Sequence, residues 1–254
     1  MNIIWHGQSC FQITIQKGKN NLVNIVIDPF DETIGLRVPK LEADILLVSH
    51  SHADHNNRKA VVSPAGSGQV PFLVDGPGEY EVKGVFIQGI DSYHDSLLGR
   101  ERGLNTIYII EAEEMKICHL GDLGQKELTD EQIEKINEVD ILMIPIGGLF
   151  TISAKEAMKI ISQIEPRIVV PMHYCLPKLK IEGLEDLDKF FKAIGIKKIE
   201  PLSKLSIKKK DISSEEARII VFQIRKDLET KSSKLQRNLE TKSSKSEKIW
   251  KRSF

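Results

Sequence analysis

ILLVSHSHADH, residues 45–55, joins a short apolar run to a dense cluster of metal-binding side chains. The run 45–48 predicts a strand, and the residues after it hold three imidazoles and a carboxylate, at His50, His52, Asp54 and His55. Imidazole nitrogen binds zinc well, and carboxylate oxygen suits zinc, manganese or iron. Because side chains alternate along an extended segment, His50 and His52 are expected on one side, with Asp54 and His55 facing a second position. One tetrahedral ion needs only four donors, so this stretch suggests two ions.

The other histidines also follow predicted strands. Apart from His6, every histidine lies at the end of a predicted strand or in the turn after it, and four strand ends carry His50, His52, His55, His94, His119 and His173. Strand ends along one sheet edge are where an α/β protein assembles a site, so we expect these side chains to meet. Asp54 and Asp122 add carboxylates, which gives enough donors for two ions. The plain alternative for residues 50–55 is a polar loop rich in histidine.

The surrounding pattern predicts an α/β fold. Alternating apolar residues indicate a hairpin over 11–27 that ends at Asp28-Pro29. Residues 75–80 have turn chemistry, and a last strand is expected over 219–224. Capping boxes that begin at Thr129 and Ser153 predict two helices, which alternate with apolar strands.

Composition points to a cytoplasmic protein. The chain has 254 residues with 36 Lys+Arg and 36 Asp+Glu, so net charge favours neither nucleic acid nor a membrane. It contains no apolar run long enough to span a bilayer, and its start does not resemble a signal peptide. Three cysteines without paired spacing fit a reducing compartment. A homo-oligomer is compatible with this composition.

The chain divides into a domain over 1–226 and a tail over 227–254. The tail has eight Lys/Arg and four Asp/Glu, few apolar residues, and the repeated sequence LETKSSK. Such a segment buries too little surface to offset its ordering entropy, so we expect a disordered basic tail. A solvated tail is the simpler interpretation, and its charge leaves contact with nucleic acid open.

Several motifs together resemble the metallo-β-lactamase superfamily. These are His50-x-His52-x-Asp54-His55, His94, His119-Leu120-Gly121-Asp122 and Pro171-Met172-His173. The opening WHGQSCF, residues 5–11, and IDPF, residues 27–30, resemble its cytoplasmic branch of L-ascorbate-6-phosphate lactonase-like proteins. The resemblance covers about residues 1–224. It implies a four-layer αββα sandwich, in which two mixed sheets face each other, helices lie outside and metals bind at one edge.

The resemblance also implies roles for single residues. His50, His52 and His94 should hold the first ion, and Asp54, His55 and His173 the second, with Asp122 bridging them. His119 could replace His94 by spacing, but in this branch it is expected to support the site. Asp28 should accept a hydrogen bond from the cluster. Gln8 departs from the family, where many relatives have a histidine, which leaves the role of this position open.

The implied activity is hydrolysis by hydroxide that is bound to one or two metal ions. Zinc is the expected metal, and Mn²⁺ or Fe²⁺ is also compatible with these ligands. Asp54 and His119 are the candidate catalytic residues; Asp54 would orient the nucleophile or take up its proton. The expected substrate is a small molecule with an ester, lactone or amide bond. Arg100 and Arg102 would suit an anionic one, although exposed loop arginines are the simpler interpretation. The alternatives are a phosphodiesterase or nuclease of the same fold, and a non-catalytic metal-binding scaffold or sensor.

Overall fold

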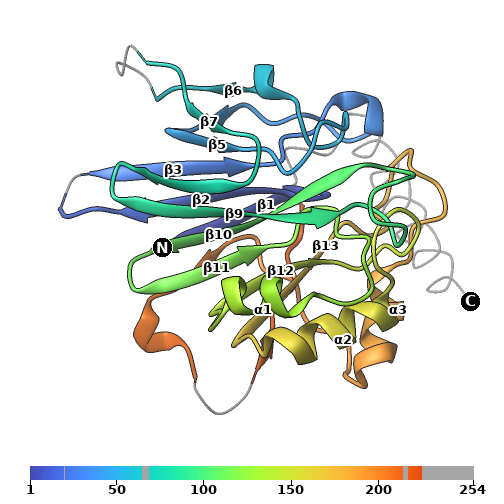
Figure 1. The fold of residues 1–254 in the computed structure, drawn as a ribbon. Helices are drawn as coiled ribbons and strands as arrows, with labels where there is room; N and C mark the ends of the chain where they lie inside the picture. Colours follow the sequence, from blue (N-terminus) through green and yellow to red (C-terminus); the bar gives the residue numbers. More distant parts are fainter. Residues whose placement is uncertain (20, 65–68, 214–216, 225–254) are drawn as a thin grey trace, which may run out of the picture.

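The computed structural model describes residues 1–19, 21–64, 69–213 and 217–224. Two mixed β-sheets face each other at its centre, with the α-helices outside one of them (Figure 1). In the described part the first sheet has the order β14 (Leu205–Ser206), β1 (Asn2–Gly7), β2 (Cys10–Gln16), β3 (Leu22–Ile27), β5 (Ile45–Leu47), β7 (Phe72–Val74). The second has the order β15 (Arg218–Ile219), β13 (Ile168–Met172), β12 (Ile141–Pro145), β11 (Met115–His119), β10 (Leu104–Ala112), β9 (Val85–Tyr93), β8 (Gly78–Val82).

The main core lies between the two sheets, and strand alternation explains how it forms. In β5, Ile45 and Leu47 point into this core. Leu46 and the following Val48 belong to a second apolar cluster on the outer side of the first sheet. Both faces of β5 are therefore buried, as the continuous apolar run predicts. The strand is thus fixed from both sides just before the histidine-rich stretch begins.

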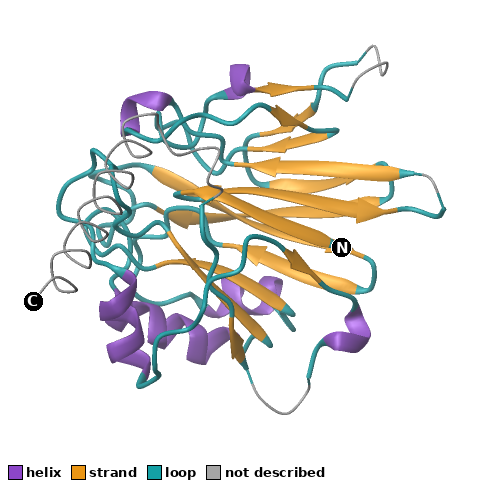
Figure 2. Ribbon diagram, turned by 180° about the vertical axis from the view of Figure 1, so that it is seen from behind, coloured by secondary structure: helices purple, strands orange, loops and turns teal. Residues whose placement is uncertain are grey.

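The outer layers differ between the two sheets. The helices α1 (Asp130–Ile136), α2 (Ala154–Ile164) and α3 (Leu187–Ile194) lie against the second sheet (Figure 2). Thr129 and Ser153 form the predicted capping boxes, which fix where α1 and α2 begin. The outer cluster of the first sheet lies instead beneath short elements: the small sheet of β4 (Leu41–Glu42) and β6 (Val61–Val62), and the 3-10 helices η1 (Glu32–Ile34) and η2 (Arg58–Ala60). The third 3-10 helix, η3, spans Lys209–Asp211.

The predicted class, an α/β sandwich of two mixed sheets, is confirmed, and two local predictions are wrong. Residues 78–80 belong to β8, because antiparallel pairing with β9 outweighs the local turn preference. The strand expected over 219–224 enters the sheet only at Arg218–Ile219. Ile220 N still donates to Val169 O in β13 (2.9 Å), but after it Val221 O and Gln223 N pair with the backbone of Leu202 instead. The predicted tail 227–254 lies outside the described residues.

Strand direction brings the functional segments together. β1, β3 and β5 run one way in the first sheet, and β9, β11 and β13 share a direction in the second. Hydrogen bonds from Thr106 N to Ser49 O (2.9 Å) and from His173 N to Gln8 O (3.3 Å) join the ends of the two sets. The residues that follow six strands therefore meet at one edge of the sandwich.

None of the helices among the described residues is long and apolar enough to cross a bilayer. All three cysteines are free; Cys10 and Cys118 are buried, and Cys175 is exposed.

Tyr108 links the two sheets through hydrogen bonds of its side-chain hydroxyl. Removal of this hydroxyl tests how much the link contributes to stability. Its buried hydroxyl lies 2.8 Å from Val48 O and 3.1 Å from Val74 O. We expect Tyr108→Phe to lower the free energy of unfolding by about 1–3 kcal/mol, because a buried carbonyl loses its donor. Urea denaturation measures this change. Tyr80→Phe, whose hydroxyl bond to Pro77 O is exposed, is the control and should change stability by less than about 0.5 kcal/mol. Equal effects of both substitutions would contradict the prediction.

Candidate metal centre

The first group of converging side chains consists of His50, His52 and His94, which come from the ends of β5 and β9. Their potential ligand atoms all lie within 4.8 Å of one another. His94 Nε2 and His52 Nδ1 lie 3.2 Å apart. The ring of His50 lies 4.6 Å, centroid to centroid, from each of the other two. Three imidazoles from two sheets thus face one point.

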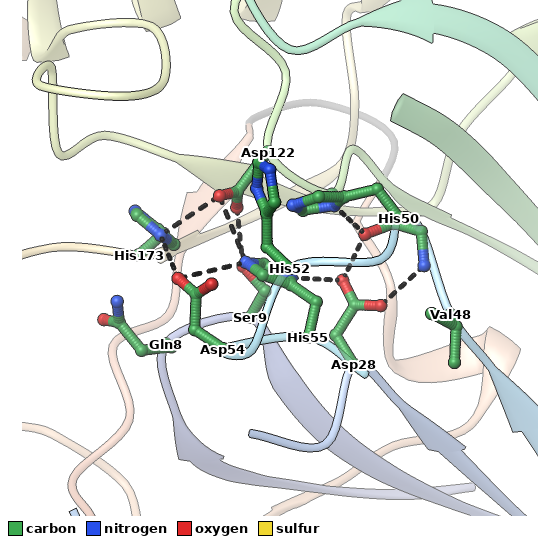
Figure 3. Close-up of polar contacts among 12 residues, drawn as sticks. Gln8, Ser9, Asp28, Val48, His50, His52, Asp54, His55, Asp122 and His173 are labelled. Atoms are coloured by element: carbon green, nitrogen blue, oxygen red, sulfur yellow. Dashed lines mark hydrogen bonds and ion pairs between the residues drawn. The ribbon is translucent and has the colours of Figure 1, made fainter. Parts of the chain in front are cut away.

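The second group consists of Asp54, His55, Asp122 and His173, again within 4.8 Å of one another (Figure 3). Asp122 Oδ2 lies 3.1 Å from His55 Nε2 and 3.2 Å from His173 Nε2. Asp54 Oδ2 lies 3.4 and 3.6 Å from the same two nitrogens. Two carboxylates and two imidazoles therefore form a compact set of four donors.

Asp122 connects the two groups. The Oδ2 atom that contacts His55 and His173 also lies 3.5 Å from His94 Nε2 in the first group. Ser9 Oγ donates to Asp122 Oδ1 (3.2 Å), and the backbone N–H of Asp122 donates to Asn105 Oδ1 (2.9 Å). Gly121 before it has φ of +56°, and a Cβ there would lie 2.3 Å from Asn105 Oδ1, so only glycine fits this turn. This arrangement is the one expected of a bridging carboxylate.

Asp28 supports the site from below. It follows β3 and is fully buried, and its carboxylate accepts from Ser49 N (2.7 Å) and Ser49 Oγ (2.6 Å). The same carboxylate lies 2.9 Å from His55 Nδ1. A carboxylate on Nδ1 fixes the ring orientation and leaves Nε2 facing the second group. The expected hydrogen bond from the cluster to Asp28 is present.

His119 lies apart from both groups, and its ring nitrogens have protein partners. Its Nε2 is 2.9 Å from Ser9 O, and its Nδ1 accepts from Gly121 N at 3.1 Å. The ring is fully buried and packs edge-on against Phe11 at 5.8 Å. The structure thus brings His94, rather than His119, to the other histidines. His119 holds the turn that presents Asp122.

The charges of the second group favour a bound cation. Burial opposes the charged form of His173, but Asp122 and Asp54 outweigh it and raise its pKa to about 9. The pKa of His55 is likewise raised, against burial, by Asp122, Asp54 and Asp28. In the first group, burial and the neighbouring His55 lower the pKa of His50 to about 3. Neutral imidazoles and ionised carboxylates are the forms that bind metal.

The hydrogen bonding and spacing of the histidine ring nitrogens show whether these residues fit a metal ion. Among the described residues, no group forms a hydrogen bond with the buried atoms His50 Nε2, His94 Nδ1 and His173 Nδ1, and His55 Nε2 and His173 Nε2 have the carboxylates of Asp54 and Asp122 beside them without hydrogen-bond geometry. Buried polar atoms normally have partners, so these nitrogens call for one. Two ligands of one tetrahedral zinc ion lie roughly 3.3 Å apart, given zinc–nitrogen distances of about 2.0–2.1 Å. The separations of 3.1–3.6 Å around Asp122 and Asp54 match that spacing. The donor sets fit two ions.

The backbone and some supporting side chains were not foreseen from the sequence. Gln8, Asp28 and His173 all have left-handed φ values, of 48°, 47° and 50°. Such strain in non-glycine residues concentrates at functional sites. Gln8 is fully buried, and both polar atoms of its amide lack a hydrogen-bond partner among the described residues. Ser9, Ser49 and Asn105 were also missed as supports, since only the folded chain shows what a serine or asparagine contacts.

The chain is similar in sequence to known proteins. Residues 2–173 match the family described as the β-lactamase superfamily domain. The UPF0173 metal-dependent hydrolase of Thermococcus onnurineus is 31% identical over 193 residues, which cover 66% of this chain and 82% of that protein. A UPF0173 metal-dependent hydrolase of Thermoplasma acidophilum is 30% identical over 195 residues, with 68% and 83% covered. The narrower likeness to lactonase-like proteins stays a prediction.

Solved structures show the same fold. A Thermotoga maritima protein described as a zinc-dependent hydrolase of the metallo-β-lactamase superfamily has a TM-score of 0.67 and 32% identity, covering 87% of this chain and 99% of that one. A metallo hydrolase of Ignicoccus hospitalis has a TM-score of 0.56 at 22% identity, covering 82% and 99%. At that lower identity the likeness concerns the fold alone.

The support from Asp28 can be tested by Asp28→Asn. The substitution disturbs the partner of His55 Nδ1 without removing any of the seven converging side chains. We expect zinc affinity to fall by about 10- to 100-fold, measured by competition with a chromophoric chelator. Asp31→Asn is the control, because Asp31 lies nearby but its carboxylate only caps η1 at Thr33 N. Unchanged affinity in Asp28→Asn would contradict the supporting role.

The distinction between His94 and His119 can be tested by metal stoichiometry. We expect His94→Ala to lose about one of two bound ions, because it removes one of the three donors of the first group. His119→Ala should keep both ions. It should instead lower the free energy of unfolding by about 1–3 kcal/mol, because the buried Ser9 O and Gly121 N lose their hydrogen bonds to the ring. Mass spectrometry of the bound metal and urea denaturation measure the two effects. Loss of an ion in His119→Ala with full retention in His94→Ala would reverse the assignment.

Proposed function

Since the chain belongs to the metallo-β-lactamase superfamily, we propose that it is a metal-dependent hydrolase that binds two zinc ions. His50, His52 and His94 would hold one ion, and Asp54, His55 and His173 the other, with Asp122 between them. The observation that carries this proposal is the pair of donor groups joined through Asp122, together with the buried Nε2 atom of His50, which forms no hydrogen bond among the described residues. The curated relatives named above are themselves called metal-dependent hydrolases.

The chemistry that bound zinc supplies is Lewis acidity toward a substrate oxygen and a lowered pKa for water. The residues of the chain set where this chemistry takes place. Asp122, His55 and His173 are almost fully buried, whereas the side chain of Asp54 is 18% exposed. Asp54 is therefore the member of the second group that an entering water can reach.

Asp54 has the charge needed to orient that water. Burial would raise the pKa of its carboxyl, but His55 and His173 outweigh burial and hold the pKa well below its usual range. The side chain is thus ionised at neutral pH and accepts a hydrogen bond from a water molecule. A water held in this way is fixed relative to the substrate, which lowers the entropic part of the barrier.

The bond we propose to be cleaved is an ester, lactone or amide bond in a small molecule. A cleft of about 380 Å³ borders His50 and His52, which is room for a small substrate. Its walls come from the segments 48–58, 75–77 and 102–106, together with Asp91. The substrate would reach the ions from the side of the first group.

A substrate panel tests the proposal. Zinc-loaded protein is assayed on simple lactones, nitrophenyl acetate and bis(nitrophenyl) phosphate, before and after treatment with a chelator. We expect turnover of a lactone or the acetate, its loss on chelation and its return with zinc. Turnover of the phosphodiester alone would replace this proposal with a phosphodiesterase. Zinc binding without turnover of any class would indicate a metal-binding protein that is not an enzyme.

Replacement of Asp54 tests the proposed catalytic residue. We expect Asp54→Ala to lower kcat by about 100-fold or more, because it removes both the acceptor for the water and one zinc donor. Circular dichroism should show an unchanged fold, since this side chain is partly exposed and outside the apolar core. Asp31→Ala, a change of the same type at an exposed carboxylate, should leave kcat unchanged. Retained activity in Asp54→Ala would contradict the assignment.

A further inference from the structure

The cleft beside His50 and His52 has charged side chains on its walls. These are Arg58, Asp75, Asp91 and Arg102. Arg58 is neutralised, because its guanidinium lies 3.0 Å from Asp75 Oδ2. Arg102 is different: no carboxylate among the described residues forms an ion pair with it. It is therefore the unneutralised cation of the cleft.

Arg102 is held in place by an aromatic ring. The central carbon of its guanidinium lies 3.8 Å from the centroid of the Phe150 ring. A guanidinium that stacks on an aromatic face is stabilised there and keeps the N–H groups at its edge available for hydrogen bonds. The side chain is thus oriented by a ring, and none of the residues that the structure describes occupies its donors.

The backbone of Arg102 is fixed next to the candidate metal centre. The buried carboxylate of Asp95 accepts from four backbone N–H groups, those of Leu97 (2.7 Å), Gly99 (2.9 Å), Glu101 (3.0 Å) and Arg102 (2.8 Å). The loop closes with a hydrogen bond from His94 N to Gly103 O (3.1 Å). The loop that carries Arg102 therefore starts at a member of the first histidine group and folds back onto it.

We propose that Arg102 binds an oxyanion of the substrate, a phosphate or a carboxylate, while the reactive bond lies at the metal centre. This inference rests on the proposed function and narrows the substrate to a small anionic molecule. The planar fork of an arginine matches the two oxygens of such a group. Arg100 and Arg102 are both exposed on this loop, but of the two only Arg102 is among the residues that line the cleft.

Binding of substrate-like anions tests this proposal without requiring turnover. Calorimetry measures the affinity of zinc-loaded protein for methylphosphonate and for succinate, which distinguishes phosphate-like from carboxylate ligands. We expect Arg102→Ala to weaken binding of at least one of them by about 10- to 100-fold, the effect of losing a hydrogen bond to a charged group. Arg102→Lys should recover only part of this loss, because it keeps the charge without the fork.

Arg100→Ala is the matched control, since it removes the same charge from the same loop away from the cleft. It should change the affinity by less than about twofold, because a charge that does not line the cleft acts on the anion only through solvent, which screens it. The proposal is overturned if Arg102→Ala binds both anions as the wild type does, if Arg100→Ala has an equal effect, or if the wild type binds neither anion.

This outcome is separable from that of the proposed function. If anion binding depends on Arg102 but the protein hydrolyses none of the substrates, the proposed hydrolase function is contradicted and the proposed anion site is supported. If the protein hydrolyses neutral esters but its anion binding does not change when Arg102 is replaced, the hydrolase function is supported and the anion site is contradicted.

Discussion

The arrangement of the site depends on the contacts that the carboxylate of Asp122 makes with the surrounding histidines. This carboxylate lies in the second sheet's layer, at the end of β11, and its Oδ2 atom lies within 3.5 Å of imidazole nitrogens from three other strand ends. Burying this charge is unfavourable unless cations or donors surround it. Ser9 Oγ donates to this carboxylate, three histidine nitrogens surround its Oδ2 atom, and Asn105 fixes the backbone of Asp122 by accepting from its N–H. Electrostatics and packing thus select the same geometry at this edge of the sandwich.

Much of the fold could be predicted because its signals are local. The apolar run before His50 required a buried strand, and the capping boxes at Thr129 and Ser153 fixed two helix starts. The candidate site also followed from position, because histidines after strands that run in one direction must meet at one edge. His94 and His173 therefore joined the 50–55 stretch in the structure, although they are far from it in sequence.

What could not be predicted depends on tertiary contacts. The segment 78–80 has turn-forming neighbours, and only its pairing with β9 makes it a strand. His119 and His94 both follow strands, so their spacing could not separate them. The difference lies in Ser9, whose carbonyl meets His119 Nε2 across the fold. Arg100 and Arg102 are equivalent in sequence, and only the folded chain distinguishes them, by placing Arg102 against Phe150 and on the wall of the cleft. In each case a partner distant along the chain decides the role.

The loop from Asp95 to Gly103 has a further consequence for how such a protein diversifies. Its first side chain ties together its own backbone, and its ends close on each other through His94 and Gly103. The loop is thus a self-contained module that is anchored to the chelating framework without contributing to the sheets. Its middle can change in sequence at little cost to the strands, as long as the residue that ties the backbone is kept. With Arg102 as the proposed ligand for the substrate anion, substitutions in this loop would alter ligand preference and leave in place the strands that position the donor side chains.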